Sequence, residues 1–451
     1  MSLYGHLIRR VVFPLYEKGL RGRPTVRYFR DYQENEFLSE SNLLDLQARK
    51  LGALLRHCYQ QVPYYQQVFN QRGITPADIP TIDELSILPI LDKKSIRQNY
   101  QSLISKESSP SPVRKATGGS TGVPLTFEHD RDSYYRRVAV MWRGYGWAGA
   151  RLGDPTIYLW GAPTGEMSAF GRAKEAMYHA LNGRRMLNAF ELSDSNVDQY
   201  IDEIQRYKPK TIVAYVAPLV EVARYCRAKK VTPFSPDSII TGAEPLPEAS
   251  REFLQQVFRC PVFNTYGSRE FMLIAAECER HAGLHINIDQ VVVEIVDDHG
   301  LPTDGPGRIL VTDLHNTRMP FVRYEIGDIG MIEKESCPCG RPFPLLKYVE
   351  GRILDVLRTP EGRPVPGEFF PHLLKDFEEI RNFQVVQSRS DQLTLKLVWG
   401  GREDLSAVEL VRQEVAKVFG PEMELRVEIL DRIDRGPSGK HRVTVNQLSS
   451  Q

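Results

Sequence analysis

The chain has 451 residues, of which 41% are hydrophobic and 25% are charged. This composition is ordinary for a globular protein, and the length exceeds one compact core, so we expect at least two domains. The 58 Lys and Arg residues nearly balance the 57 Asp and Glu residues, which leaves a net charge of +1. Such a balance argues against nucleic acid or an anionic bilayer as a partner and favours small molecules.

The N-terminal segment is basic and apolar, but its apolar run at 11–13 is too short for a signal-peptide core. A helix packed on the body of the protein is favoured here over a membrane-surface helix. No stretch reaches the length of a membrane span, so we expect no transmembrane segment. The six cysteines are too scattered for a disulfide framework, which favours a reducing compartment such as the cytoplasm.

The predicted secondary structure is of the α/β class. A helix is expected to run to about residue 60, because apolar residues recur at helical spacing at Leu43, Leu44, Leu46, Leu51, Leu54 and Leu55. Short apolar runs at 156–159, 211–215 and 238–240 alternate with helical segments, which indicates layers with mostly parallel strands. Strand patterns at 291–296 and 308–312 flank a turn and predict a more antiparallel subdomain.

The chain is predicted to divide into two domains after residue 351. Residues 1–351 should form a large N-terminal domain of layered α/β subdomains. Residues 352–451 change character, with a hairpin-like stretch, a charged strand pair and a helix near 404–419. This tail predicts a small α+β C-terminal domain of ordinary size.

A glycine- and hydroxyl-rich loop is the first candidate for a functional site. It comprises Thr117, Gly118, Gly119, Ser120, Thr121, Gly122, Val123 and Pro124. Backbone N–H groups of such small residues can approach a polyphosphate closely, and the hydroxyls add further donors. The loop lacks the lysine and spacing of a P-loop and contains no GxGxxG. It therefore predicts a phosphate site of another class.

Two alternatives to a phosphate loop remain at this point. Gly118, Ser120 and Gly122 also satisfy GxSxG, which would make Ser120 a hydrolase nucleophile on a strand-to-helix turn. The alternating residues after Pro124 predict a strand rather than the helix that such a turn requires. An ordinary surface turn is the other alternative, because a short motif alone does not exclude it.

Further motifs follow the loop in a fixed order. They are Gly242-Ala243-Glu244-Pro245, Asn264-Thr265-Tyr266-Gly267-Ser268-Arg269-Glu270, Arg323-Tyr324-Glu325-Ile326-Gly327-Asp328, Gly351-Arg352 and Gly439-Lys440. Together with the loop they resemble the adenylate-forming superfamily, in its phenylacetate-CoA ligase-like branch, which includes capsular-polysaccharide-type members. The resemblance spans nearly the whole chain, and the shared order carries it more than any single motif does.

The resemblance implies a role for each motif. It assigns nucleotide binding to Thr117, Gly118, Gly119, Ser120, Thr121, Gly122, Gly242, Ala243, Glu244, Pro245, Tyr266, Gly267, Ser268, Asp328 and Arg352. It further implies that Glu270 holds Mg2+ and that Lys440 assists catalysis. These residue types suit the tasks: a carboxylate is an oxygen ligand for Mg2+, Lys supplies a mobile positive charge, and Asp accepts hydrogen bonds from ribose hydroxyls.

The implied reaction is ATP-dependent, AMP-forming activation of a carboxylate. In this family the large domain binds ATP and the carboxylate, the mobile C-terminal domain acts as a lid, and coenzyme A accepts the acyl group. An aromatic acid is the family default, and a homodimer is compatible with the sequence. Alternatives are an amine or carrier-protein acceptor, as in amide formation for polysaccharide biosynthesis, and a non-catalytic nucleotide-binding protein.

Two positions depart from the family pattern. Leu125 stands where many relatives carry a lysine after the loop, so backbone and hydroxyl groups are expected to hold pyrophosphate. Leu354 stands where the hinge aspartate usually lies, and Asp355 follows it. Because domain rotation at this hinge separates adenylation from thioester formation, the sequence supports the first half-reaction more strongly than the second.

A zinc site is predicted from cysteines and histidines in two distant segments. Cys278, Cys337 and Cys339 supply three sulfurs, and His281 supplies an imidazole with His285 as its competitor. Three thiolates and one imidazole suit tetrahedral zinc, and some members of the branch have a similar set. Free thiols in a reducing compartment are the alternative.

Overall fold

A computed structural model describes residues 19, 22–107, 111–117, 125–161, 169–193, 195–350, 356–367, 369–374, 377, 380–399, 405–433 and 443–448. The chain forms two compact units. Unit 1 comprises residues 1–115, 127–152 and 263–351, whereas unit 2 comprises residues 116–126, 153–262 and 352–451.

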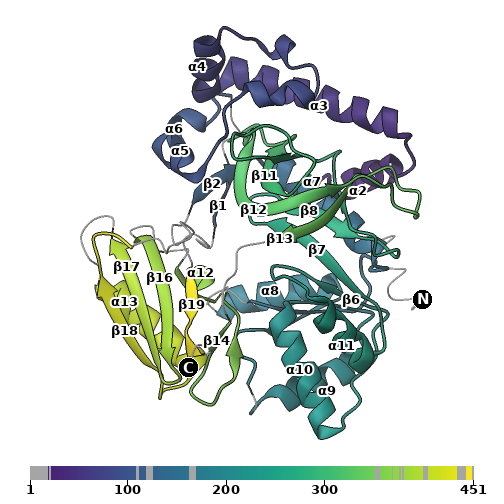
Figure 1. Ribbon diagram of the computed structural model, residues 1–451. Coiled ribbons are helices and arrows are strands. Elements are labelled where there is room, and N and C mark those ends of the chain that lie inside the picture. The colour runs from purple at the N-terminus through teal and green to yellow at the C-terminus, as the bar shows by residue number, and fades with distance from the viewer. Residues whose placement is uncertain are drawn as a thin grey trace. The chain divides into compact units, whose positions relative to one another are not determined.

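The first part of unit 1 is mainly helical (Figure 1). Its helices are α2 (Thr25–Asn35), α3 (Glu40–Gln61), α4 (Pro63–Arg72), α5 (Lys93–Gln98) and α6 (Tyr100–Leu103), with 3-10 turns η3 (Pro76–Asp78) and η4 (Asp83–Ile87). The two-stranded sheet β1 (Val113–Ala116) and β2 (Thr126–His129) follows, and then α7 (Arg131–Trp147).

Helix α3 confirms the prediction from its leucine spacing. Its N-cap Ser39 accepts a hydrogen bond from the Asn42 amide at 3.3 Å. Leu43, Leu51 and Leu54 lie on its buried face. The helix ends before Pro63 because the residue preceding a proline is pushed into an extended conformation, as Val62 is here. Pro63 then occupies the first turn of α4, where its missing N–H costs no hydrogen bond.

The second part of unit 1 is a mostly antiparallel sheet. Its strands are β7 (Val262–Ser268), β8 (Met272–Glu277), β9 (Leu284–Ile286), β10 (Val291–Val296), β11 (Gly307–Asp313), β12 (Tyr324–Glu333) and β13 (Leu345–Glu350). They run in the order β10-β11-β12-β13-β9-β8-β7. The β10 and β11 pairing, with Val293 opposite Val311, confirms the predicted antiparallel subdomain.

A parallel sheet forms the first part of unit 2. It runs β6-β5-β3-β4 and consists of β3 (Thr156–Trp160), β4 (Arg184–Asn188), β5 (Thr211–Ala214) and β6 (Ser238–Thr241). The connecting helices are α8 (Ala169–Leu181), α9 (Val197–Tyr207), α10 (Val216–Lys229) and α11 (Glu248–Phe258). Every residue of β5 and β6 is buried, which explains their continuous apolar pattern and confirms the predicted parallel strands.

The C-terminal tail has the predicted α+β composition. Its elements are β14 (Leu357–Arg358), β15 (Pro364–Val365), α12 (Phe369–Leu374), β16 (Ile380–Arg389), β17 (Gln392–Trp399), α13 (Leu405–Phe419), β18 (Glu424–Ile429) and β19 (Thr444–Asn446). β14 and β15 form the hairpin, and the strands β18-β17-β16-β19 form a four-stranded sheet. Phe369 of the tail belongs to the same hydrophobic core as Phe190 and Tyr215 of the parallel-sheet segment.

The α/β class and the small α+β C-terminal domain are thus confirmed. A junction between units falls after residue 351, although residues 352–451 share their unit with residues 153–262. The division at 351 into a nucleotide-binding domain and a lid stays a prediction. None of the described helices has the length and apolar character that crossing a membrane requires.

Candidate functional site

Two hydrogen bonds between Thr117 and Leu125 hold the described ends of the glycine-rich loop together. The Thr117 amide donates to the Leu125 carbonyl at 2.9 Å, and the Leu125 amide donates to Thr117 Oγ1 at 3.0 Å. β1 ends at Ala116 and β2 begins at Thr126, so the loop joins two strands as predicted. The strand after the loop excludes the hydrolase turn at Ser120, which requires a helix there. Leu125 is fully buried and acts as an apolar anchor.

Several predicted site residues lie outside the described part of the chain. They are Gly118, Gly119, Ser120, Thr121, Gly122, Arg352 and Lys440. Their roles stay predictions.

The segment 242–245 follows β6 in unit 2 and is anchored to α10. The Gly242 amide donates to the Ala214 carbonyl at 3.3 Å, and Ala243 adopts a left-handed backbone with φ of 65°. Glu244 Oε2 accepts a hydrogen bond from the Ala217 amide at 2.7 Å, in the first turn of α10. Burial raises the pKa of Glu244 to about 7 against the lowering effect of these backbone bonds. Glu244 therefore braces the loop, while Pro245 is exposed beside it.

Tyr266, Gly267 and Ser268 end β7, and Glu270 lies in the turn to β8. A Cβ atom at Gly267 would lie 1.8 Å from the Met272 carbonyl oxygen, so only glycine fits this hairpin. Ser268 Oγ accepts a hydrogen bond from the Phe271 amide at 3.3 Å, which shapes the turn. Ser268 therefore has a structural partner in this hairpin.

Two tyrosine hydroxyls connect this hairpin to β12. Tyr324 donates to Glu270 Oε1 at 2.8 Å, and Tyr266 donates to Asp328 Oδ2 at 2.8 Å. Glu270 is buried, with 4% of its surface exposed, and the described residues supply no cation to its carboxylate. Burial of an unpaired carboxylate is costly, so this position suits a ligand to a bound cation. The structure thus pairs Tyr266 with Asp328 and pairs Glu270 with Tyr324, which was not among the predicted site residues. The nucleotide-binding roles of these residues stay predictions.

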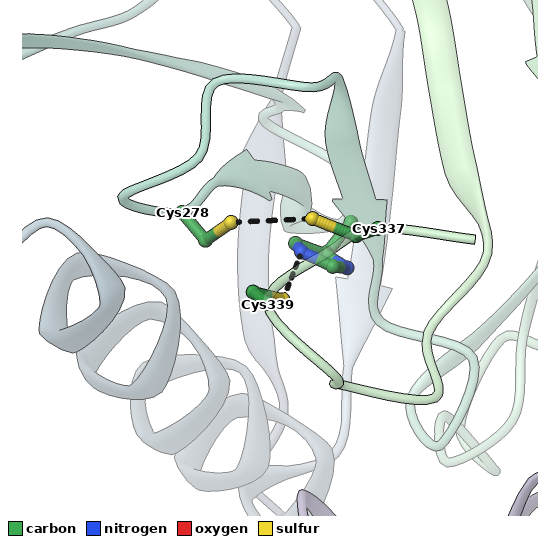
Figure 2. Close-up of side chains that lie close together, drawn as sticks. Cys278, Cys337 and Cys339 are labelled. Carbon is green, nitrogen blue, oxygen red and sulfur yellow. Dashed lines mark hydrogen bonds between the residues drawn. The ribbon is translucent and has the colours of Figure 1, made fainter. Parts of the chain in front are cut away.

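The predicted cysteines gather in one cluster with a single histidine (Figure 2). The cluster consists of Cys278, His285, Cys337 and Cys339, whose ligand atoms all lie within 4.8 Å of one another. Cys278 follows β8, His285 lies in β9, and the other two cysteines lie between β12 and β13. The distances are 3.6 Å from Cys278 Sγ to Cys337 Sγ and 3.4 Å from Cys339 Sγ to His285 Nε2.

Surrounding groups orient the ligands of this Cys/His cluster. His285 Nδ1 lies 3.2 Å from the Phe343 carbonyl oxygen, which leaves Nε2 facing the sulfurs. The backbone amides of Arg280 and Arg341 donate hydrogen bonds to the sulfurs of Cys278 and Cys339 at 3.5 and 3.4 Å, although burial raises the pKa of the Cys278 thiol. Such outer contacts are typical of metal sites.

His281 lies outside the cluster, which corrects one of the two predicted imidazole ligands. Its Nδ1 lies 3.1 Å from Glu277 Oε2, and its ring packs against Phe263 with centroids 4.7 Å apart. His285 lies in the cluster because the β8 and β9 pairing sets Ala276 opposite it, next to the Cys278 end of β8. Proximity in sequence favoured His281, whereas strand pairing selects His285.

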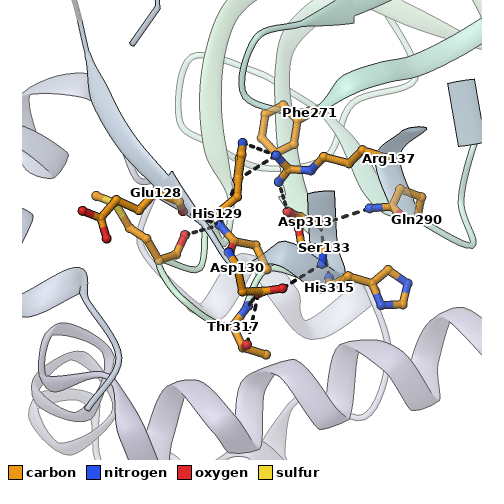
Figure 3. Close-up of polar contacts among 12 residues, drawn as sticks. Glu128, His129, Asp130, Ser133, Arg137, Phe271, Gln290, Asp313, His315 and Thr317 are labelled. Atoms are coloured by element: carbon orange, nitrogen blue, oxygen red, sulfur yellow. Dashed lines mark hydrogen bonds and ion pairs between the residues drawn. The ribbon is translucent and has the colours of Figure 1, made fainter. Parts of the chain in front are cut away.

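A buried polar network that the sequence did not predict lies near β2 (Figure 3). Arg137 of α7 forms an ion pair with Asp313 at the end of β11 and contacts the His129 ring. Asp313 also accepts hydrogen bonds from Gln290 Nε2 at 3.3 Å and the His315 amide at 3.1 Å. These contacts join the segment after the loop to the sheet of unit 1. Arg137 carries no motif that would have predicted its burial.

Asp130 extends the same network. Its carboxylate caps α7 by accepting from the Ser133 amide at 2.7 Å, and its other oxygen accepts from the Thr317 amide at 2.8 Å. The sequence signal was present, because an aspartate directly before a helical segment is a common N-cap. Together with the Arg137 and Asp313 pair, this cap fixes the strand that follows the glycine-rich loop.

His129 is expected to make stability depend on pH. Burial, together with the positive charges of Arg137 and Lys115, lowers the pKa of His129 well below its ordinary value of 6.5. Below about pH 6.5 the unfolded chain therefore binds more protons than the folded one. The free energy of unfolding then falls by up to about 1.4 kcal/mol for each unit by which the pH is lowered. Urea unfolding between about pH 5 and 7 should show a shallower pH slope in His129→Gln. An unchanged slope in the variant would contradict this origin.

Two protein families and several relatives match the chain. Residues 116–319 match the AMP-binding enzyme family, and residues 357–447 match the CapK C-terminal domain. Protein CapK of Staphylococcus aureus is 24% identical over 425 residues, which cover 92% of each chain. A phenylacetate-coenzyme A ligase of Thermus thermophilus is 27% identical over 371 residues, which cover 80% of this chain and 81% of that protein.

Solved structures share the fold. The structure of 2-hydroxyisobutyryl-CoA ligase with 2-HIB-AMP and CoA in the thioesterification state has a TM-score of 0.63 at 18% identity, covering 93% of this chain and 94% of that chain. The same ligase in the postadenylation state has a TM-score of 0.60, covering 93% and 92%. The two family matches and the relatives described above lead to one conclusion. The chain belongs to the adenylate-forming superfamily, in the branch that contains phenylacetate-CoA ligases and CapK.

Proposed function

We propose that this protein activates a carboxylic acid with ATP and passes the acyl group to the thiol of coenzyme A. The observation that carries the proposal is a pair of hydrogen bonds, from Tyr266 to Asp328 and from Tyr324 to Glu270, in a chain of the adenylate-forming superfamily. Phenylacetate-CoA ligases among its relatives support the acceptor, and an aromatic acid is the substrate class proposed with it.

The reaction has two steps. A carboxylate oxygen attacks the α-phosphorus of ATP, the bond from that phosphorus to the bridging oxygen breaks, and pyrophosphate leaves. The coenzyme A sulfur then attacks the acyl carbonyl carbon, AMP leaves, and the thiol proton passes to solvent. Both steps join anions, so the protein must neutralise charge and fix the geometry of attack.

Glu270 is proposed to hold Mg2+, which neutralises charge on the phosphates when it is bound. The buried carboxylate fits this task, because the described residues give it a hydroxyl donor and no positive charge. Asp328 is proposed to accept hydrogen bonds from the ribose hydroxyls, and Tyr266 is proposed to pack on the adenine ring. Lys440 is proposed to place a positive charge beside the carboxylate and the α-phosphate, a role that rests on the family resemblance.

The Cys/His cluster is proposed to hold a structural Zn2+. Zinc bonds of about 2.3 Å to sulfur and 2.0 Å to nitrogen give tetrahedral edges of about 3.8 and 3.5 Å. The distances of 3.6 Å between Cys278 and Cys337 and 3.4 Å between Cys339 and His285 fit these edges. Four protein ligands leave no open position, so the metal would join β8, β9 and the loop before β13 without entering the reaction.

A different acyl acceptor is the second candidate function. The tail matches the CapK C-terminal domain, and similarity to CapK extends over 92% of the chain. Capsular-polysaccharide-type members of the branch suit amide formation, so this similarity supports an amine or carrier-protein acceptor as the alternative. Carboxylate activation is common to both candidates.

Carboxylate-dependent exchange of pyrophosphate into ATP tests the shared step. With a panel of aromatic and aliphatic acids, we expect exchange for at least one acid in the wild type and its loss in Lys440→Ala. An exchange rate that no acid changes, or one that is the same in Lys440→Ala as in the wild type, would refute the proposal. Product analysis with coenzyme A then separates the acceptors, because a thioester supports the first candidate and its absence favours the second.

A further inference from the structure

The two carboxylate motifs of unit 1 have the same internal spacing. Tyr266 precedes Glu270 by four residues, and Tyr324 precedes Asp328 by four residues. Each motif therefore contributes one tyrosine hydroxyl, which can donate a hydrogen bond, and one carboxylate, which can only accept. The motifs come from the β7 and β8 hairpin and from the start of β12.

The hydrogen bonds between these residues run across the motifs rather than within them. Tyr324 of the second motif donates to Glu270 of the first at 2.8 Å, and Tyr266 of the first donates to Asp328 of the second at 2.8 Å. In the sheet order β13, β9 and β8 separate β12 from β7, so backbone pairing does not bring the two motifs together. The side-chain bonds join them directly, and we call them the crossed tyrosine pairs.

The ring of Tyr324 is fixed before any ligand arrives. It is fully buried, stacks on Phe321 with centroids 4.9 Å apart and lies 5.9 Å from the Phe271 ring. The backbone beside it is anchored as well, because the Glu325 amide donates to the Leu91 carbonyl at 3.0 Å. A hydroxyl on such a rigid ring gives the Glu270 carboxylate a fixed point of attachment.

A glutamate side chain has several rotatable bonds, and ordering it on ligand binding costs conformational entropy. The bond from Tyr324 to Oε1 fixes one oxygen of Glu270, which leaves Oε2 as the oxygen available to a cation. Tyr266 similarly fixes Oδ2 of the half-buried Asp328. Prior orientation of both carboxylates lowers the cost of binding a metal-bound nucleotide.

We propose that Tyr324 is a positioning residue for the cation-binding carboxylate and that Tyr266 is the equivalent residue for the ribose-binding carboxylate. This inference rests on the proposed function, because it takes Glu270 and Asp328 as the two nucleotide contacts. Its new content is the crossed assignment: the tyrosine of each motif serves the carboxylate of the other. A tyrosine that only supported its own motif would link Tyr324 to ribose binding and Tyr266 to the cation.

Tyrosine-to-phenylalanine variants separate these assignments, because each removes one hydroxyl and keeps the ring. Two probes report the two carboxylates by titration calorimetry. Adenosine reports the ribose contact, and α,β-methylene-ATP titrated with and without Mg2+ reports the enhancement that the cation provides. A hydrogen bond to a charged group is worth about tenfold or more in binding. Tyr200→Phe serves as the matched control, since Tyr200 donates to the Asn188 carbonyl at 2.8 Å in unit 2.

In Tyr324→Phe we expect the enhancement of α,β-methylene-ATP affinity by Mg2+ to fall about tenfold and the affinity for adenosine to stay unchanged. Tyr266→Phe should lose about tenfold in adenosine affinity and keep the enhancement, and Tyr200→Phe should change neither. Enhancement unchanged in Tyr324→Phe, or the reverse pattern, would overturn the inference while leaving carboxylate activation intact. Wild-type protein that shows neither nucleotide binding nor acid-dependent exchange would instead overturn the proposed function itself.

Discussion

Glu270→Gln is expected to lower kcat/KM for carboxylate-dependent pyrophosphate exchange by about a hundredfold, which corresponds to about 3 kcal/mol of lost charge stabilisation. The substitution keeps the shape of the side chain and an oxygen that accepts from Tyr324, but it removes the negative charge that a cation requires. The variant should fold normally, because an amide is less costly to bury than an unpaired carboxylate. Exchange rates measured over a range of Mg2+ concentrations check this expectation.

Glu325→Gln is the matched control for that experiment. Glu325 lies within the second motif but has no assigned nucleotide contact, and its carboxylate pairs with Arg308 at 3.2 Å. Its loss should leave exchange and its Mg2+ dependence near the wild-type values. Equal losses in both variants would show a general effect of charge removal on unit 1, and full activity in Glu270→Gln would exclude Glu270 as the cation ligand.

The second large effect is expected at the Cys/His cluster. The double variant Cys337→Ser, Cys339→Ser should lose bound zinc and unfold at a markedly lower temperature, since several kcal/mol of metal-binding free energy contribute to folding. Metal analysis of protein purified without added zinc, together with thermal unfolding, provides the test. Cys226→Ser is the matched control, because this buried cysteine lies in unit 2, outside the cluster. Metal-free wild-type protein that folds stably would contradict a structural zinc.

Histidine variants test which imidazole completes the cluster. His285→Ala should lose zinc as the double cysteine variant does, because His285 Nε2 lies 3.4 Å from Cys339 Sγ. His281→Ala should keep the metal, since its Nδ1 lies at Glu277 instead. The opposite result would restore the ligand that proximity in sequence favoured.

Much of the fold could be predicted from local patterns. The leucine spacing of α3 and the fully buried runs of β5 and β6 are local signals, and each became the expected element. The grouping of segments into units could not be predicted in this way. Residues 153–262 and 352–451 share a core through contacts such as Phe190 with Phe369, whose ring centroids lie 5.5 Å apart, and no local pattern encodes such a contact.

The candidate site shows the same division between local and long-range information. The order of the motifs, through its resemblance to the adenylate-forming superfamily, selected Tyr266, Glu270 and Asp328 as candidates, and the two carboxylates suit an acceptor and an oxygen ligand. The partners of these residues depend on tertiary structure. Tyr324 meets Glu270 across 54 positions of sequence, and Arg137 meets Asp313 across 176.

Transfer of oxygen from the carboxylate to AMP tests the central claim most directly. Attack by a carboxylate oxygen on the α-phosphorus, followed by release of AMP from the acyl group, leaves that oxygen in the phosphate of AMP. The exchange assay first identifies an acid that the protein activates, and this acid is then labelled with oxygen-18 in its carboxylate. Mass spectrometry should find one labelled oxygen in the AMP formed. AMP without the label, or ADP and phosphate in its place, would contradict activation through an acyl-adenylate.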